Sequence, residues 1–273
     1  MKSNMSIPKA KKRLSYYRYR CAEEGKKGKL HLAHLIAVQL VSWLNPFEYL
    51  KRIKVERLYD GYLTDQKVAK DFRKRYLPEQ FQDGGGLALD FGCGRGRHCA
   101  MLSQCGFKVV GIDPIRYDYW QKIPNAQFLQ GSNKELKLFK NESFDLCISF
   151  QVLMYIRNDK ETVRELARVL RRRGWLVLQL TNQNNLKTTI TQRRLINDPR
   201  IIRYYTPEEA SLMLEKAGFK IERIWTEKFY SPFFTGFFNY LLEIILPHQM
   251  LDFVSSRTPP KYRGMINITA QKM

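Results

Sequence analysis

The chain has 273 residues, of which 44% are hydrophobic, so it is long enough to bury the core of one large α/β domain with appendages or of two small domains. Its 47 basic and 26 acidic residues give a formal charge of +21, which favours anionic partners such as nucleic acid, acidic lipid headgroups or phosphorylated substrates without choosing among them. The five cysteines are odd in number and include no C-x-x-C pair, which argues against a disulfide framework and a zinc site. No apolar run reaches about 18 residues, so we expect no membrane-spanning helix. Together with the lack of a signal peptide, these features are typical of a cytoplasmic protein.

Residues 1–82 are predicted to form an N-terminal extension, in which a basic tail is followed by helical segments. Residues 1–30 are polar, basic and rich in tyrosine, and this composition agrees equally with phosphate binding and with disorder. The segment Leu30–Leu50 has the pattern of a helix that is apolar almost all round. We expect that helix either to pack on other apolar segments, as a cap or a dimer face, or to lie at an interface.

Residues 83–273 alternate short apolar strands with amphipathic helices, which predicts an α/β fold with a doubly wound, mostly parallel sheet covered on both faces. The predicted strands are Leu87–Phe91, Phe107–Ile112, Ala126–Leu129, Phe144–Phe150, Trp175–Leu180, Phe219–Trp225 and Met265–Gln271. The predicted helices are Arg97–Cys105, Asp159–Arg173 and one that Thr206 caps with Glu209 and that Gly218 ends. Arg171–Arg173 would then lie at a helix end, where cations complement the helix dipole.

The stretch Asp90-Phe91-Gly92-Cys93-Gly94-Arg95-Gly96 joins the first predicted strand to the first predicted helix. Glycines there allow a sharp turn and a close ligand, and the free N–H groups of the helix point to the same place. Asp113 ends the second strand, 19 residues after Gly94, where a carboxylate can accept both hydroxyls of a ribose. The spacing is G-x-G-x-G and not the G-x-G-x-x-G of dinucleotide sites, and Asp90 would repel a pyrophosphate but attract an ammonium or sulfonium group. Both features favour S-adenosylmethionine as the ligand.

The segments Leu87–His98 and Gly106–Pro114 resemble the first two motifs of class I S-adenosylmethionine-dependent methyltransferases. They are most similar to the broad group that includes quinone-biosynthesis methyltransferases, the methyltransferase type 11 group. Further matches are Ser143–Leu146, Glu165–Leu170, Gly174–Leu178, Tyr205–Glu209 and Ala217–Phe219. The resemblance implies a Rossmann-like sheet of seven strands, S-adenosyl-L-methionine as cofactor and methyl transfer as the reaction, and it leaves the acceptor open.

The resemblance also implies a set of cofactor-binding residues, which are Asp90, Gly92, Cys93, Gly94, Gly96, Ile112, Asp113, Pro114, Ser132, Asn133, Phe150 and Gln151. In it, the three glycines line the methionine moiety, Asp90 meets the amino group through water, and Asp113 holds the ribose. Ile112 and Pro114 flank the adenine. Ser132 and Asn133 stand where the family often has an aspartate that contacts the adenine amino group. Phe150 and Gln151, with Met154, would border the reacting methyl group.

No catalytic base can be assigned from the sequence. His98 is expected to pack from the first helix, and Cys147 lies inside a strand, away from the place of a nucleophile for pyrimidine methylation. Tyr155 follows the fourth strand, where related enzymes often carry a histidine or aspartate, and is a contact only. The strand exit Ser149–Val152 lacks the Asn/Asp-Pro-Pro-aromatic arrangement of base-amino methyltransferases, which disfavours that reaction.

Residues 229–262 are predicted to be a hydrophobic insertion before the last strand, and its aromatic part is Phe229–Phe253. It suits interfacial docking, a tunnel for an apolar substrate, or packing against Leu30–Leu50. We therefore expect methyl transfer to a small apolar or lipid-linked acceptor, with peripheral contact to a membrane surface. Two alternatives remain: methylation of RNA or protein through the basic N-terminal region, which is less favoured, and a non-catalytic binding protein on the same fold.

Overall fold

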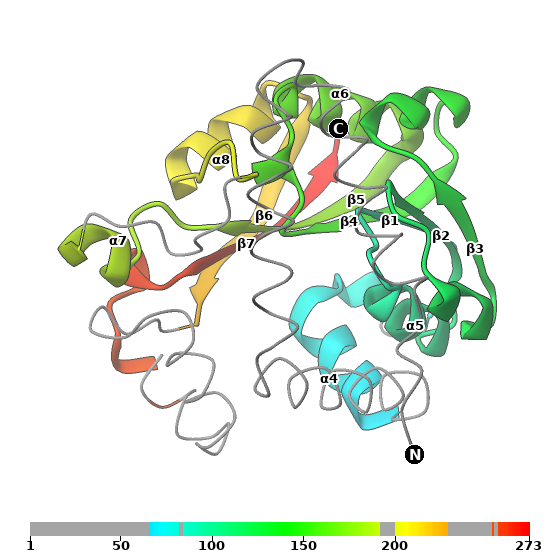
Figure 1. Cartoon of the computed structure of the whole chain (residues 1–273), viewed down its shortest axis with the longest axis horizontal. Helices are drawn as coiled ribbons and strands as arrows, with labels where there is room; N and C mark the ends of the chain where they lie inside the picture. The colour runs from blue at the N-terminus through cyan, green and yellow to red at the C-terminus, as the bar shows by residue number, and fades with distance from the viewer. Residues whose placement is uncertain (1–65, 82–83, 192–199, 229–252, 254–255) are drawn as a thin grey trace, which may run out of the picture.

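The computed structural model describes residues 66–81, 84–191, 200–228, 253 and 256–273, which form a sheet flanked by helices on both faces (Figure 1). The predicted basic tail, the helix Leu30–Leu50 and the insertion Phe229–Phe253, apart from Phe253, lie outside the described residues. Within the described part of the chain, no helix combines the length and apolarity needed to cross a bilayer.

The sheet has seven strands in the order β3-β2-β1-β4-β5-β7-β6, which confirms the predicted doubly wound α/β fold. The first five strands in this order pair in parallel, and β7 pairs antiparallel with both β5 and β6. The strands are β1 Leu87–Phe91, β2 Lys108–Asp113, β3 Ala126–Gln130, β4 Phe144–Phe150, β5 Leu170–Thr181, β6 Phe219–Glu227 and β7 Met265–Lys272. All seven predicted strands are therefore present.

Helices α4 and α5 cover one face of the sheet and α6 and α8 the other (Figure 1). The helices are α4 Gln66–Tyr76, α5 Arg97–Gln104, α6 Asp159–Val169, α7 Leu186–Thr191 and α8 Pro207–Glu215, with short 3-10 turns η1 Glu79–Phe81, η2 Asp118–Lys122, η3 Asn133–Leu138, η4 Leu153–Tyr155 and η5 Pro260–Tyr262. The predicted capping box of Thr206 and Glu209 starts α8. Ala69 and Phe72 of α4 are buried in the same core as α5, so this part of the predicted extension packs on the sheet.

Each strand divides its side chains between the two cores, because successive residues of a strand point to opposite faces. In β1, Leu89 and Phe91 lie in the core under α6 and α8, whereas Ala88 lies in the core under α4 and α5. Asp90 alternates with Leu89 and Phe91, so its side chain points toward α5. This alternation decides which groups at the end of β1 can reach a ligand.

The helix predicted over Asp159–Arg173 is too long, since α6 ends at Val169 and β5 begins at Leu170. Leu170 is fully buried and pairs with Phe144 of β4, so the sheet takes the residues that helix propensity alone would keep helical. Arg171–Arg173 are exposed residues of β5 next to a register shift, and Arg173 has a φ of 60°. The interpretation of these arginines as a cationic helix end was therefore wrong.

Candidate active site

A cavity of about 520 Å³ lies at the carboxyl ends of β1, β2, β3 and β4. β1 pairs with β2 on one side and with β4 on the other, so connections leave β1 and its neighbours in opposite directions and a crevice opens between them. Eight of the twelve predicted cofactor-binding residues line the cavity: Gly92, Ile112, Asp113, Pro114, Ser132, Asn133, Phe150 and Gln151. The remaining four are Asp90, Cys93, Gly94 and Gly96. They lie in or behind the loop Gly92–Gly96, which we call the glycine loop.

The glycine loop is tied to β2 by its backbone. The N–H groups of Gly92 and Cys93 both donate to the carbonyl of Ile112, at 2.8 and 3.0 Å. Gly92 has a φ of 79°, and a Cβ at this residue would overlap the side chain of Val152. Gly94 has a φ of 53° and a Cβ there would meet no atom within 4 Å. Gly92 is thus required for packing within the protein, whereas Gly94 leaves open space that a ligand can enter.

Asp113 connects the end of β2 to the glycine loop. Its Oδ2 accepts a hydrogen bond from the Gly94 N–H and its Oδ1 one from the Ile115 N–H, both at 2.9 Å. Burial raises the pKa of this carboxyl group, and the two backbone N–H bonds oppose that rise. Each carboxylate oxygen has further lone pairs after these bonds, so Asp113 is fixed in place and can still accept hydroxyl hydrogen bonds from a ribose.

Asp90 and Cys93 are buried behind the loop. The Cys99 thiol on α5 donates to Oδ2 of Asp90 at 3.2 Å, and burial raises the pKa of Asp90 to about 7. Burial likewise raises the pKa of the Cys93 thiol to about 11. All four cysteines among the described residues are free thiols, as expected. Asp90 therefore lies behind the loop and is not among the described residues that line the cavity.

Trp120 contacts the glycine loop and was not predicted from the sequence. Its indole N–H donates to the Gly94 carbonyl at 2.7 Å, and its ring stacks on Phe128 with centroids 4.8 Å apart. A Cβ on Gly96 would meet the side chain of Ile123 at 2.5 Å, so this glycine, like Gly92, serves internal packing. The aromatic run before β3 was the available signal, but nothing in its spacing connects it with the loop.

The wall that follows β3 is η3, which Ser132 caps. The Ser132 hydroxyl donates to Oε2 of Glu135 and accepts from the Lys134 N–H, so its hydrogen-bonding capacity is largely used inside the turn. The Asn133 Nδ2 donates to Oγ1 of Thr162 on α6 at 3.2 Å. This bond fixes the Asn133 amide, whose Oδ1 can accept a further hydrogen bond, and Asn133 lines the cavity.

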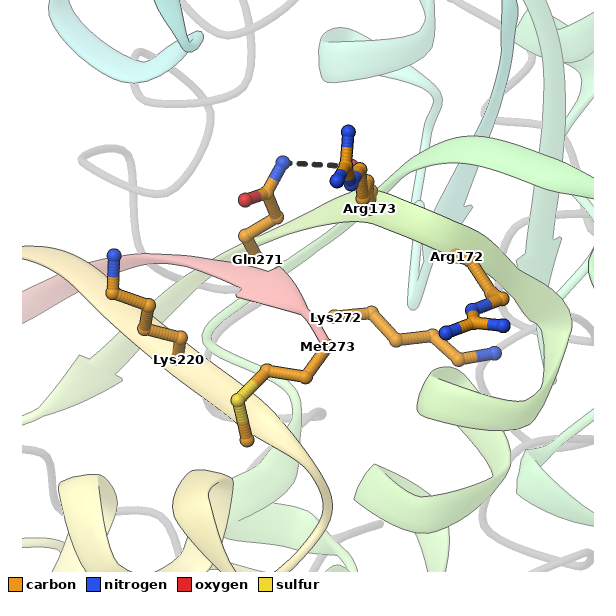
Figure 2. A pocket seen from close by; sticks show the side chains of 6 residues that line it. All are labelled: Arg172, Arg173, Lys220, Gln271, Lys272 and Met273. Atoms are coloured by element: carbon orange, nitrogen blue, oxygen red, sulfur yellow. Dashed lines mark hydrogen bonds between the residues drawn. The ribbon is translucent and has the colours of Figure 1, made fainter.

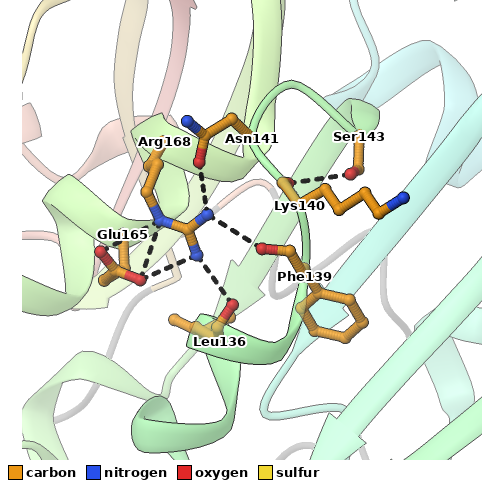
Figure 3. A network of polar contacts seen from close by, with 7 residues as sticks. All are labelled: Leu136, Phe139, Lys140, Asn141, Ser143, Glu165 and Arg168. Atoms are coloured by element: carbon orange, nitrogen blue, oxygen red, sulfur yellow. Dashed lines mark hydrogen bonds and ion pairs between the residues drawn. The ribbon is translucent and has the colours of Figure 1, made fainter.

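Arg168 of α6 holds η3 and the turn after it in place (Figure 3). Its Nη2 donates to the Leu136 carbonyl and its Nη1 to the Phe139 carbonyl, both at 2.9 Å. Nη1 also reaches Oδ1 of Asn141, and Nε binds Glu165 one helical turn earlier. One guanidinium thus joins the wall of the cavity to α6.

The residues after β4 close the opposite side of the cavity. Oε1 of Gln151 accepts from Oγ1 of Thr181 at 2.6 Å, which fixes that side chain beside β5. The Phe150 ring packs against His98, with centroids 4.5 Å apart, and against Tyr76 of α4 at 5.1 Å. His98 also stacks on Phe72 and burial lowers its pKa, so it packs as expected from its place on the helix.

Tyr155, Arg157 and Arg200 also line the cavity. The Ile202 N–H donates to the Met154 carbonyl at 2.8 Å, and this bond holds the segment that begins at Arg200 beside η4. The Arg200 guanidinium lies over the Tyr155 ring, 5.5 Å from its centroid. The two arginines were not among the predicted site residues, because they are far apart in the sequence and belong to no motif.

A second hollow, of about 540 Å³, lies at the opposite edge of the sheet and is lined by Arg172, Arg173, Lys220, Gln271, Lys272 and Met273 (Figure 2). Lys220 pairs with Glu222 at 2.8 Å, and Lys272 lies 3.6 Å from Glu142. Among the described residues, no group of three or more His, Cys, Asp and Glu side chains is placed to hold a metal ion.

Residues 60–224, more than half of the chain, match the family model described as a methyltransferase domain. An uncharacterised protein of Methanocaldococcus jannaschii is 26% identical over 192 residues, which cover 62% of this chain and 74% of that protein. A tRNA U34 carboxymethyltransferase of Marinobacter nauticus is 32% identical over 128 residues, which cover 44% of this chain and 39% of that protein. A ubiquinone biosynthesis O-methyltransferase of Bradyrhizobium diazoefficiens is 28% identical over 145 residues, with 50% and 54% covered. The chain thus spans about half or less of the length of the latter two relatives.

Solved structures share the fold. An S-adenosylmethionine-dependent methyltransferase of Archaeoglobus fulgidus superposes with a TM-score of 0.54 at 17% identity, covering 80% of this chain and 99% of that one. The 1,6-didemethyltoxoflavin-N1-methyltransferase of Burkholderia thailandensis, with bound substrate and S-adenosylhomocysteine, superposes with a TM-score of 0.51 at 15% identity, covering 84% and 91%.

Proposed function

Because this chain belongs to the methyltransferase domain family and is an S-adenosylmethionine-dependent methyltransferase, we propose that the cavity at the carboxyl ends of β1 to β4 holds the cofactor and admits a small-molecule acceptor beside Phe150 and Gln151. S-Adenosylmethionine supplies an electrophilic methyl group, so the protein mainly needs to align the acceptor with it and exclude water. Family membership also decides against the alternative of a non-catalytic binding protein.

The assignment of the cofactor's parts follows the geometry of the cavity. Asp113 receives the ribose hydroxyls, and the open space at Gly94 receives the methionine moiety. At the adenine end, the Asn133 Oδ1 is a better acceptor for the amino group than Ser132, whose hydroxyl is engaged with Glu135. Asp90 contributes from behind the loop, through water, to the charge that attracts the cofactor's ammonium group.

The observation that carries this proposal is Asp113, which binds the glycine loop through Gly94 and also lines the cavity. We expect Asp113→Ala to weaken S-adenosylhomocysteine binding by at least about 30-fold, because it removes charge-assisted hydrogen bonds and leaves the Gly94 and Ile115 N–H groups without their acceptor. Isothermal titration calorimetry measures this, with Asp71→Ala, an exposed aspartate of α4, as the matched control. An unchanged affinity in Asp113→Ala would overturn the assignment.

An apolar or lipid-linked acceptor, taken at a membrane surface, stays a prediction, because the segments that suggest it lie outside the described residues. The expected result is co-flotation of the full chain with anionic liposomes, weakened when Phe237 and Phe238 are replaced by serine. Lack of any liposome binding would remove the membrane contact from the proposal and leave the methyl transfer untouched.

RNA is a second candidate acceptor, because a similar relative is named for its action on tRNA and residues 1–30 are strongly basic. Binding through phosphates falls steeply as the salt concentration rises. Salt-sensitive RNA binding that disappears on deletion of residues 1–30 would favour RNA over a small molecule. RNA binding that is absent at low salt would exclude it.

A further inference from the structure

We propose that Trp120 is a positioning residue for the cofactor, which holds Gly94 of the glycine loop in the conformation that receives the methionine moiety. This inference rests on the proposed function and adds to it a residue that lies outside the loop and its motif. Gly94 has a φ of 53°, and a Cβ there would meet no atom within 4 Å, so a ligand can approach its backbone closely. The groups that fix this backbone therefore decide how well the loop fits a ligand.

Gly94 is held on both sides by side chains. Its N–H donates to Oδ2 of Asp113 at 2.9 Å, and its carbonyl accepts from the Trp120 indole N–H at 2.7 Å. The Cys93 thiol, a weak donor, lies 3.8 Å from the same carbonyl oxygen, so the indole supplies the stronger bond. Because glycine has more conformational freedom to lose than any other residue, these two bonds reduce the ordering that a ligand must impose on the loop.

The indole of Trp120 is itself held in place. Its side chain is buried, and its ring stacks on Phe128 of β3 with centroids 4.8 Å apart and ring planes 10° apart. The Trp120 backbone N–H donates to the Tyr117 carbonyl at 3.2 Å, which fixes the start of η2. A ring that is fixed by packing thus directs its one donor at Gly94, and a site is preorganised by side chains held in this way.

Trp120 also contacts the wall at the other end of the cavity. Tyr117 lines the cavity together with Pro114, and its ring lies at 62° to the indole, with centroids 6.2 Å apart. Pro114 belongs to the adenine side of the proposed cofactor, so one tryptophan contacts the loop for the methionine moiety and a residue near the adenine. The bond to Gly94 needs the indole N–H, whereas the contact with Tyr117 needs only an aromatic ring. The two contributions can therefore be separated by substitution.

The experiment measures the affinity of the full chain for two ligands by isothermal titration calorimetry. One is S-adenosylhomocysteine, and the other is methylthioadenosine, which lacks the amino-acid part. Trp120→Phe keeps an aromatic ring against Phe128 and Tyr117 but removes the indole N–H. We expect it to weaken S-adenosylhomocysteine binding about tenfold and methylthioadenosine binding less than about twofold. A side chain that only packs would change both affinities by the same factor.

Trp175→Phe is the matched control. Trp175 packs against the same core as Trp120, and its buried indole N–H has no hydrogen-bond acceptor among the described residues. The same substitution there removes no hydrogen bond and should leave both affinities unchanged. Benzothienylalanine at residue 120, which keeps the two-ring shape without the N–H, replaces Trp120→Phe if that variant does not fold, and the same result is expected of it.

A loss of the same factor for both ligands, or no loss for either, would overturn the inference. In that event, binding of S-adenosylhomocysteine by the wild type and its loss in Asp113→Ala leave the proposed function standing. A wild-type chain that binds neither ligand contradicts the proposed function, and the role of Trp120 with it.

Discussion

The two edges of the sheet carry hollows of nearly equal volume, about 520 Å³ at the carboxyl ends of β1 to β4 and about 540 Å³ at the opposite edge, but their linings differ in kind. At the carboxyl edge, backbone N–H groups, glycines in left-handed conformations, a carboxylate and aromatic rings converge from several connections. At the opposite edge, long cationic side chains from β5, β6 and β7 surround the hollow, and its described lining includes no carboxylate and no aromatic ring (Figure 2).

Topology explains this difference. The connections from the carboxyl ends of β1 and β4 run to opposite faces of the sheet, so the strands end in diverging turns whose backbone is close enough to hold a ligand. The opposite edge receives the starts of β5 and β6 and the end of β7, and its cations are partly offset by Glu142 and Glu222. Volume alone thus does not identify a ligand site, whereas convergent polar groups on fixed turns do.

The largest effect we expect is at Gly92, where the carboxyl edge is most tightly packed. Gly92→Ala should lower the free energy of unfolding by about 2–4 kcal/mol, because the new Cβ overlaps Val152 and the left-handed backbone disfavours alanine. Urea denaturation measures this loss. Gly218→Ala is the control, since its φ is 87° but its Cβ would meet nothing within 4 Å, and it should lose only about 1 kcal/mol. Equal losses would show that packing of the loop on Val152 adds nothing.

The second effect is a pH dependence that comes from Asp90. Burial raises its pKa from 3.8 to about 7, so the folded protein holds this proton more tightly than the unfolded chain does. The contribution of the protonated Asp90 to the free energy of unfolding is therefore fully present below about pH 4 and is lost as the pH rises through about 7. We expect this loss to amount to about 2–4 kcal/mol. Urea denaturation between pH 5 and pH 8 should show a steeper decline in the wild type than in Asp90→Asn. Parallel declines in the two proteins would contradict the assignment of this pH dependence to Asp90.

Asp90 also shows where sequence information ends. The seven strands, the glycine loop and its link to Asp113 were predictable, because glycine spacing and strand ends are local signals. The direction of Asp90 was not, since Leu87–Phe91 is apolar on both faces and a doubly covered strand has no polar side to mark its orientation. Its bond to Cys99 depends on how α5 packs, which no pattern within β1 records.

The end of α6 was wrongly predicted, and Arg157 and Arg200 of the cavity lining were not predicted, for a related reason. Leu170 becomes a strand residue because it pairs with Phe144, a contact between segments 26 residues apart that outweighs local helix propensity. Arg200 reaches the cavity only because its segment bonds to η4 through Ile202. Long-range pairing determines both the secondary structure of Leu170 and the position of Arg200. Its influence is largest in the connections between strands and helices, which differ most among proteins of one fold.

A third, smaller effect concerns the wall formed by η3. Arg168→Met should lower the free energy of unfolding by about 1–2 kcal/mol, because the carbonyls of Leu136 and Phe139 lose a charged donor. It should also weaken S-adenosylhomocysteine binding, since η3 positions Asn133. Arg164→Met, an exposed arginine of the same helix, is the control and should change either quantity by less than about 0.5 kcal/mol. A loss of stability without any loss of affinity would limit Arg168 to a structural role.

The smallest effect is expected at the opposite edge. Arg172→Gln and Arg173→Gln remove exposed charges, and the hydrogen bond that the Arg173 backbone carbonyl accepts from the Gln271 side chain survives the substitution. The double variant should therefore shift the free energy of unfolding and of S-adenosylhomocysteine binding by less than about 0.5 kcal/mol each. Urea denaturation and calorimetry on the same preparation test both. A tenfold loss of cofactor affinity in this variant would mean that the two edges are coupled through β5, and the contrast between a ligand site and a basic hollow would no longer hold.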